Sequence, residues 1–258
     1  MRKIFTISLG LIPFAVILLV WQFVSGRVVS IVYLPPISAI FNDLLIAFTS
    51  GNHLYSLRAN SVLTLERALL GFTIAVAIGV PVGVGIGLSK RISKLLEPTT
   101  EVFRVLPGIV LIPFFVLLIG INQTFYVVFV AFGAVWPILI NTIDGVKGVE
   151  PMYFAVAKSF RITGIKNFVK ITVPGASPYI FSGMRVSLLL CLLVTIAAEM
   201  VTGHNGLGFS VFTAMEFSNI TMLYAQIFLI GVIGFLLNGA FIVVEARLMA
   251  WHKNLQRS

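Results

Sequence analysis

Long apolar stretches alternate with short polar ones along this chain. Six of the apolar stretches are long enough to cross the hydrocarbon core of a bilayer, which takes roughly 20 mostly apolar residues in a helix. Shorter, mixed segments carrying Pro, Gly and charged residues separate them. The pattern predicts an all-α integral membrane protein with six transmembrane helices, at residues 4–24, 62–88, 103–120, 124–143, 180–201 and 223–246.

Composition supports a membrane protein. Of the 258 residues, 59% are apolar and 10% are charged, and the mean hydropathy is +1.05, far from an ordinary soluble domain. The single cysteine, Cys191, excludes an intrachain disulfide. The first apolar segment follows Arg2 and Lys3, as a signal peptide does. Its apolar run is longer than the roughly 7 to 15 residues of a signal sequence, which favours a membrane anchor.

The cations predict the orientation of the chain, because cytoplasmic connections carry an excess of Lys and Arg. With the N-terminus inside, Arg27 and Arg58 are the cations of the outer connections. Both termini are then cytoplasmic. We attribute the net charge of +9 mainly to the orientation of the chain in the membrane. The sequence does not show the combination of basic and aromatic residues that is typical of a nucleic-acid-binding surface. The expected cytoplasmic cations are Arg2, Lys3, Lys90, Arg91, Lys94, Lys147, Lys158, Arg161, Lys166, Lys170, Arg247, Lys253 and Arg257.

One basic stretch, "FAVAKSFRITGIKNFVKITVP" at 154–174, has more pattern than a simple connector. It predicts two short amphipathic helices that join at Thr163 and Gly164 and end at Pro174 and Pro178. So short a pair cannot bury its apolar side alone, and it needs a membrane surface or a protein groove. The expected apolar sides comprise Phe154, Ala157 and Phe160 in the first helix and Ile165, Phe168, Val169 and Thr172 in the second.

This stretch resembles the EAA loop of permease subunits in bacterial ATP-driven (ABC) importers. That pattern reads E-A-A, three residues, G, nine residues, I-x-L-P, and its spacing is matched here. Ala155 stands where the family often has Glu, Val156 replaces the first Ala, and Arg161 replaces Gly. In the family the loop seats in a groove of a cytoplasmic ATPase. The resemblance implies a coupling loop that includes Ala155, Val156, Ala157, Phe160, Arg161, Gly164, Ile171, Val173 and Pro174.

The resemblance extends over about residues 60–247, to the nitrate, sulfonate and taurine branch of these permeases. It rests on the R-x-L-x-G-F opening at Arg67, the Leu106-Pro107 pair, and the closing Ala198, Glu199 and 206–208. It implies a type I (MetI-like) permease in the bacterial inner membrane, working as a homodimer with a cytoplasmic ATPase and an extracytoplasmic solute-binding protein. The expected regions are an anchor and external helix (1–60), a permease core (61–247) containing the coupling loop (144–178), and a cytoplasmic tail (248–258).

The pathway and the energy source can be addressed from the residues. The chain has no G-x-x-x-x-G-K-[ST] loop, so ATP and Mg²⁺ are expected in the partner ATPase, with no cofactor on this chain. Scattered histidines give no metal cluster and no catalytic pairing is apparent. Intramembrane charges and helix-breaking prolines are candidates for the pathway or its gate. These candidates are Arg67, Arg104, Pro107, Pro113 and Glu199.

Other features have structural explanations or leave alternatives open. Gly79, Gly83 and Gly87 recur every four residues, which predicts close helix packing. Glu199 either orients the "TGHNGLG" loop or gates the pathway.

Residues 25–61 predict a helix after Pro35 and Pro36 that lies on the outer membrane surface. This helix and residues 203–221 are candidates for docking of the binding protein. A self-sufficient secondary transporter is the alternative function, disfavoured by the lack of internal repeats. A purely structural membrane subunit leaves the spaced loop unexplained.

Overall fold

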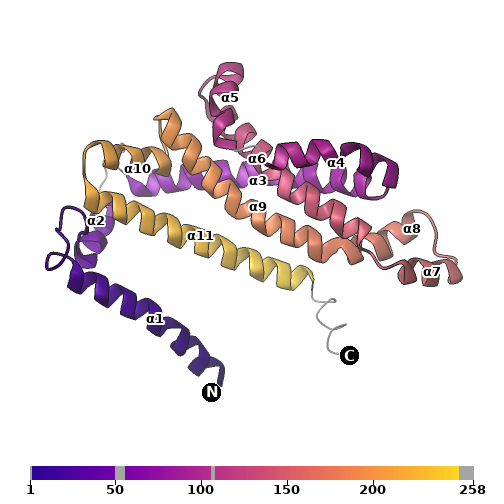
Figure 1. Ribbon diagram of the computed structural model, residues 1–258, viewed down its shortest axis with the longest axis horizontal. Helices are drawn as coiled ribbons and strands as arrows, with labels where there is room; N and C mark the ends of the chain where they lie inside the picture. Colours follow the sequence, from indigo (N-terminus) through magenta and orange to yellow (C-terminus); the bar gives the residue numbers. More distant parts are fainter. Residues whose placement is uncertain (1, 50–55, 106–107, 250–258) are drawn as a thin grey trace.

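The computed structural model describes residues 2–49, 56–105 and 108–249, and this part of the chain is almost entirely helical (Figure 1). Four helical stretches within it are long and apolar enough to cross a membrane, and shorter apolar helices accompany them. The elements are α1 (Arg2–Val24), α2 (Ile37–Thr49), α3 (Leu57–Gly87), α4 (Lys90–Val105), η1 (Gly108–Leu111), α5 (Ile112–Ile119), α6 (Gln123–Lys147), α7 (Pro151–Ser159), α8 (Ile165–Asn167), η2 (Phe168–Thr172), α9 (Val173–Thr202), α10 (Leu207–Glu216) and α11 (Ile220–Leu248).

Helices α3, α6 and α9 form the centre of the bundle, with α6 packed against both of the others. A row of small residues on α3 permits its close approach to α6. A β-carbon added at Gly79 would lie 3.0 Å from Ile138, one at Gly83 would lie 2.7 Å from Thr142, and one at Gly87 would lie 2.7 Å from Val146. The predicted role of these three glycines in close packing is confirmed.

Substituting Gly83 tests this packing. Because the Gly83→Ala methyl group would meet Thr142 and the Leu139 carbonyl of α6, we expect it to cost about 1 to 3 kcal/mol through overpacking. Gly85→Ala is the matched control, since a β-carbon there meets nothing within 4 Å. Thermal unfolding of both variants in detergent should show a clear loss for Gly83→Ala only. Equal melting temperatures would contradict the packing role.

Two sequence-based expectations about helix boundaries are wrong. The predicted span 103–120 is not one helix: it includes the end of α4, the 3₁₀ turn η1 and the short helix α5. Hydropathy measures apolar content, which is the same for a broken and a continuous segment. The second short helix of the basic stretch also does not end at Pro174 or Pro178. Residues Ile165–Thr202 run on as one helical stretch through the π-turn η2.

The position of each proline explains this continuity. Pro174 is the second residue of α9 and directly follows the turn η2, so its missing N–H falls where the regular hydrogen-bond ladder is already interrupted. The preceding π-turn, Phe168–Thr172, is a common adjustment where the regular hydrogen-bond ladder is interrupted. Pro178 lies inside α9, one helical turn further on. The helix therefore passes through both prolines.

Helices α2 and α10 lie at the end of the bundle opposite α7 and α8, where α1 ends and α11 begins (Figure 1). Helix α2 follows Pro35 and Pro36 as expected and packs against α11, burying Ile40 and Ala47. Helix α10 packs against α9 and α11. Trp21 of α1 donates a hydrogen bond to the Pro35 carbonyl (3.0 Å) and contacts the ring of Tyr224 edge-on, which joins α1 to this group.

Candidate functional site

The basic stretch forms a structured end of the bundle rather than a solvated connector. Val149, Ala176 and Ile180 form a buried cluster there, and Phe154 and Phe168 pack against it. Ala157 of the same segment is also buried. Helix α7, through Phe154, and the turn η2, through Phe168, are therefore held against the ends of α6 and α9 by apolar contacts.

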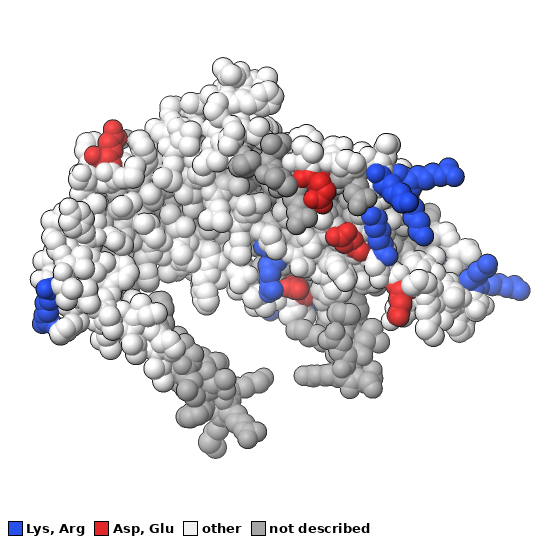
Figure 2. Space-filling model, in the orientation of Figure 1, with Lys and Arg blue, Asp and Glu red and all other residues white. Residues whose placement is uncertain are grey.

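The opposite side of this segment remains uncovered in the single chain. The exposed fractions of Phe160, Ile165 and Val169 are 75%, 81% and 56%. The sequence predicted that Phe160 shares a face with Phe154 and Ala157, and that Ile165 and Val169 share one with Phe168 and Thr172. This expectation is wrong, because Phe160 lies at the end of α7 and Val169 lies in the π-turn η2, where the regular α-helical spacing does not hold. The largest group of Lys and Arg side chains on the visible face lies at the same end of the molecule (Figure 2). The exposed apolar surface of the coupling segment consists of Met152, Tyr153, Val156, Phe160, Ile165 and Val169.

The turn between α7 and α8 contains two residues in the left-handed backbone region. Gly164 has φ +59° and begins α8, which confirms the break expected at Thr163 and Gly164. Arg161 also has a positive φ, +57°. A side chain in this region is uncommon and mildly strained, whereas glycine adopts it freely. The loop pattern has glycine at the position of Arg161, and this conformation gives a physical reason for that preference.

A second polar site lies at the other end of the bundle, where Arg67 and Glu199 form a buried ion pair. The distance from Arg67 Nη1 to Glu199 Oε1 is 2.8 Å, and the two side chains are 3% and 0% exposed. Thr64 donates to Glu199 Oε2 at 2.8 Å, and the backbone N–H of Gly208 donates to the same oxygen at 3.0 Å. Each carboxylate oxygen therefore has partners, which a buried charge requires.

Every nitrogen of the Arg67 guanidinium donates at least one hydrogen bond. Its Nε donates to Gln123 Oε1 at 2.9 Å, and Nη2 donates to Asn205 Oδ1 at 2.6 Å. The Arg67 Cζ atom lies 3.6 Å from the centre of the Tyr126 ring, a distance at which the ring face attracts a cation. The polar cluster, defined as Thr64, Arg67, Gln123, Tyr126, Glu199 and Asn205, thus links α3, α6, α9 and the loop before α10.

This cluster also fixes the start of α10. The N–H of Leu207 donates to Thr64 Oγ1 (2.9 Å), and the N–H of Gly206 donates to Asn60 Oδ1 (3.2 Å). Gly206 has φ +107° and lies against the Glu199 carboxylate, so that a β-carbon there would collide with it. Of the two roles considered for Glu199, its contacts fit the orientation of the "TGHNGLG" loop. Its role as a gate, and that of Arg67 in the pathway, stay predictions.

Of the other pathway candidates, the structure describes Pro113 and the backbone of Arg104. Pro113 is at the first turn of α5, where proline is well tolerated. Arg104 lies in the last turn of α4, but its side chain and Pro107 are outside the described residues. Sequence reasoning did not single out Thr64, Gln123, Tyr126 or Asn205. The available signals were the i, i+3 spacing of Thr64 with Arg67 and of Gln123 with Tyr126.

The described residues contain no group of three or more His, Cys, Asp and Glu side chains placed to hold a metal ion. Long apolar helices, a structured cationic end with an uncovered apolar surface, and a buried polar cluster at the other end define a polytopic membrane transport subunit. Residues 75–250 match the family described as "Binding-protein-dependent transport system inner membrane component", and the chain belongs to this family.

Individual permeases are similar to this chain over most of its length. The putative aliphatic sulfonates transport permease protein SsuC of Bacillus subtilis is 30% identical over 99% of this chain and 91% of its own length. The taurine transport system permease protein TauC of Escherichia coli is 31% identical over 97% of this chain and 91% of its own. In an inward-facing structure of the MetNI methionine ABC transporter, a chain 18% identical superposes with a TM-score of 0.68 over 77% of this chain and 99% of its own.

The chain is therefore the non-catalytic, multi-pass inner-membrane permease of an ABC transporter that depends on a binding protein. It falls in the branch with the sulfonate, taurine, nitrate and bicarbonate permeases. Membership of this family implies a separate ATPase and a solute-binding protein as partners. Its all-helical fold is that of the MetI-like permeases.

Proposed function

We propose that this chain forms half of the translocation pathway of an importer for a small oxygen-rich solute, such as nitrate, an aliphatic sulfonate or taurine. Two copies enclose the pathway, and each crosses the membrane six times through α1, α3, the α4–α5 segment, α6, α9 and α11. Both termini and the α7–α8 end lie in the cytoplasm, because most cations are on those segments. The ATP and Mg²⁺ are bound by the partner ATPase, and this chain binds no cofactor.

The observation that carries this proposal is the exposed apolar surface of the coupling segment. Large apolar side chains such as Phe160 and Ile165 are exposed there, amid the cations Lys158, Arg161 and Lys166. A cationic apolar patch held on a rigid helical end fits a groove on a cytoplasmic protein. The continuous helix from α8 through η2 into α9 then carries movement of the ATPase into the membrane.

A cavity beside α6 and α9 supports a pathway along these helices. Its volume is about 520 Å³, and Phe103, Trp136, Asn141, Asp144 and Leu190 are among the residues that line it. Trp136 is at the middle of α6, the depth at which transport sites usually lie. We assign this face to the pathway, with Arg104 and Pro107 on the adjoining segment as candidate lining residues.

Ile165→Asp tests the coupling role. Because this side chain is 81% exposed, the substitution should leave the thermal stability of the permease unchanged while placing a charge in the ATPase contact. We expect at least a tenfold loss of ATPase co-purified with the tagged permease and a parallel loss of ATP-driven uptake in proteoliposomes. Ile165→Leu is the control and should retain both. Undiminished ATPase recovery with Ile165→Asp would refute the assigned contact.

A further inference from the structure

A cavity of about 530 Å³ lies at the end of the bundle that carries α7, where the apolar helices α3 and α6 end. Its walls come from the turn between α3 and α4, from α4, from the end of α6, from α7 and from η2, and we call it the α4–η2 cavity. Three of the residues that line it are lysines, Lys90, Lys94 and Lys147, and none of the others is charged. The cavity is therefore cationic.

The three lysines have no counter-charge in the part of the chain that the structure describes, where no carboxylate lies within ion-pair distance of them. Glu101 and Asp144 border an adjoining cavity of about 110 Å³, which shares Lys147 but neither of the other two lysines. Lys90 and Lys94 are one turn apart on α4, and like charges at this spacing repel each other. An anion bound in the cavity would offset this repulsion.

Two buried hydroxyl groups border the same cavity, Ser93 on α4 and Thr172 at the end of η2. Each residue is 3% exposed. Neither hydroxyl has a hydrogen-bond partner among the described residues, and neither oxygen is fully closed to solvent. Buried polar groups are usually paired, because burial removes their hydration. A ligand in the cavity can accept a hydrogen bond from each hydroxyl and thereby link α4 to η2.

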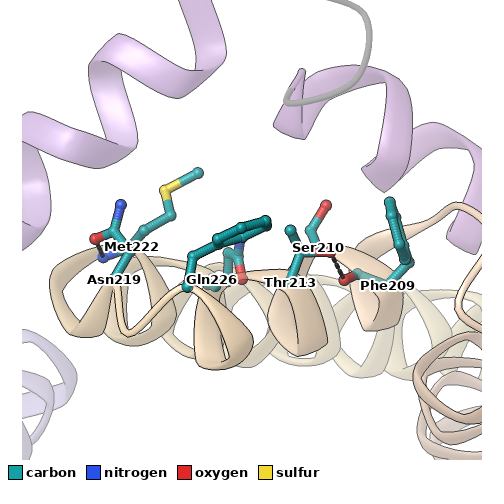
Figure 3. Close-up of a pocket in the computed structure, with 8 residues that line it drawn as sticks. Phe209, Ser210, Thr213, Asn219, Met222 and Gln226 are labelled. Carbon is teal, nitrogen blue, oxygen red and sulfur yellow. Dashed lines mark hydrogen bonds between the residues drawn. The ribbon is translucent and has the colours of Figure 1, made fainter.

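The orientation of the chain in the membrane accounts for cations at this end, but it does not require them to share a cavity with unpaired hydroxyls. The start of α4, a helix of 16 residues, adds backbone N–H groups and a partial positive charge to this end. A cavity at the opposite end of the bundle, between α10 and α11, differs: its volume is about 260 Å³ and its lining residues are all uncharged (Figure 3).

The donors and the walls of the α4–η2 cavity indicate the class of ligand. Ammonium and hydroxyl groups are donors that bind phosphate oxygens. The walls also include the apolar side chains of Leu88, Val149 and Phe154, and basic pockets between helices at a membrane surface bind the headgroups of anionic lipids. We propose that the α4–η2 cavity binds an anionic phosphate group, supplied by a membrane lipid or by soluble phosphate.

The test uses the full-length permease purified with its ATPase, and its two arms distinguish the two sources. Native mass spectrometry of complexes from phosphatidylcholine nanodiscs with increasing fractions of phosphatidylglycerol gives a saturation curve for the anionic lipid. Calorimetry in nanodiscs of phosphatidylcholine alone, with ADP bound to the ATPase, measures the binding of inorganic phosphate. Saturable binding of phosphatidylglycerol assigns the phosphate group to a lipid, and saturable binding of inorganic phosphate alone assigns it to a soluble source.

Variants connect the binding to this cavity. Ser93→Ala removes a hydroxyl but no charge, so general attraction to a basic surface would not change. We expect Ser93→Ala and Lys94→Gln each to weaken binding of the anion about tenfold, as the loss of a hydrogen bond to a charged group does. Arg91→Gln is the matched control, because it removes the same charge from an exposed residue of α4 that does not line the cavity. This control should bind the anion as tightly as the wild type.

Three outcomes would overturn the inference: no saturable binding of either probe, binding unchanged in Ser93→Ala, or equal losses in Arg91→Gln and Lys94→Gln. The last two would show attraction to a basic surface rather than a site. Thr172→Val, which replaces the other hydroxyl with a methyl group of similar size, provides a second variant if the Ser93→Ala protein does not fold, and the same tenfold loss is expected of it.

Discussion

Glu199→Gln is expected to lower the free energy of unfolding by about 3 kcal/mol or more, since it leaves the Arg67 guanidinium buried without its counter-charge. The carboxylate of Glu199 is 0% exposed and lies 2.8 Å from Arg67. Its replacement by a neutral amide also weakens the contacts with Thr64 and Gly208 that hold the start of α10. The measurement is thermal unfolding of the purified permease in detergent.

Glu245→Gln is the matched control. Glu245 pairs with Arg185 at 3.5 Å, and the two side chains are 27% and 39% exposed. Such a partly exposed pair contributes at most about 1 kcal/mol. A double variant, Arg67→Met with Glu199→Leu, removes both buried charges and should be less destabilised than Glu199→Gln alone. A Glu199→Gln protein as stable as Glu245→Gln would show that the ion pair does not hold this end of the bundle together.

Gly206→Ala is expected to cost more than about 3 kcal/mol, because backbone strain of about 1 to 3 kcal/mol is added to a collision with the Glu199 carboxylate. The backbone of Gly206, with φ +107° and ψ 178°, is essentially restricted to glycine. We expect the loop before α10 to detach from α3. Limited proteolysis at residues 203–206 and thermal unfolding would report this change.

Gly203→Ala separates the cost of backbone strain from the cost of a collision with a neighbouring side chain. Gly203 also has a positive φ, +65°, but a β-carbon there meets nothing within 4 Å, so this variant should lose only about 1 to 2 kcal/mol through backbone strain. Resistance of Gly206→Ala to proteolysis at the wild-type level would mean that the loop does not depend on its contact with Glu199.

The sequence was sufficient for features that depend on local pattern. Apolar runs located α1, α3, α6, α9 and α11, because a lipid-crossing helix must be long and apolar. The spacing of Gly79 and Gly83 predicted a close helix contact, because residues four apart share a helix face, and the structure shows that the partner is α6.

Features that depend on distant parts of the chain were not predicted. Arg67 and Glu199 are 132 positions apart, and no periodicity connects them. The broken segment between α4 and α5 has the apolar content of a continuous helix, so that hydropathy could not distinguish the two. Helix α7 ends with its C-cap at Phe160, directly before the left-handed Arg161, where the residue type itself would have suggested an ordinary helical backbone.

The π-turn η2 determines how α8 is rotated about the helix axis relative to α9. A π-turn holds one more residue than an α-helical turn, and one residue corresponds to a rotation of about 100° around a helix axis. The five residues Phe168–Thr172 therefore set the angular phase of α8 relative to α9. With this phase, Phe168 packs inward while Ile165 and Val169 face outward. The surface that we propose binds the ATPase is thus determined by a single extra residue in the helical stretch that continues into α9.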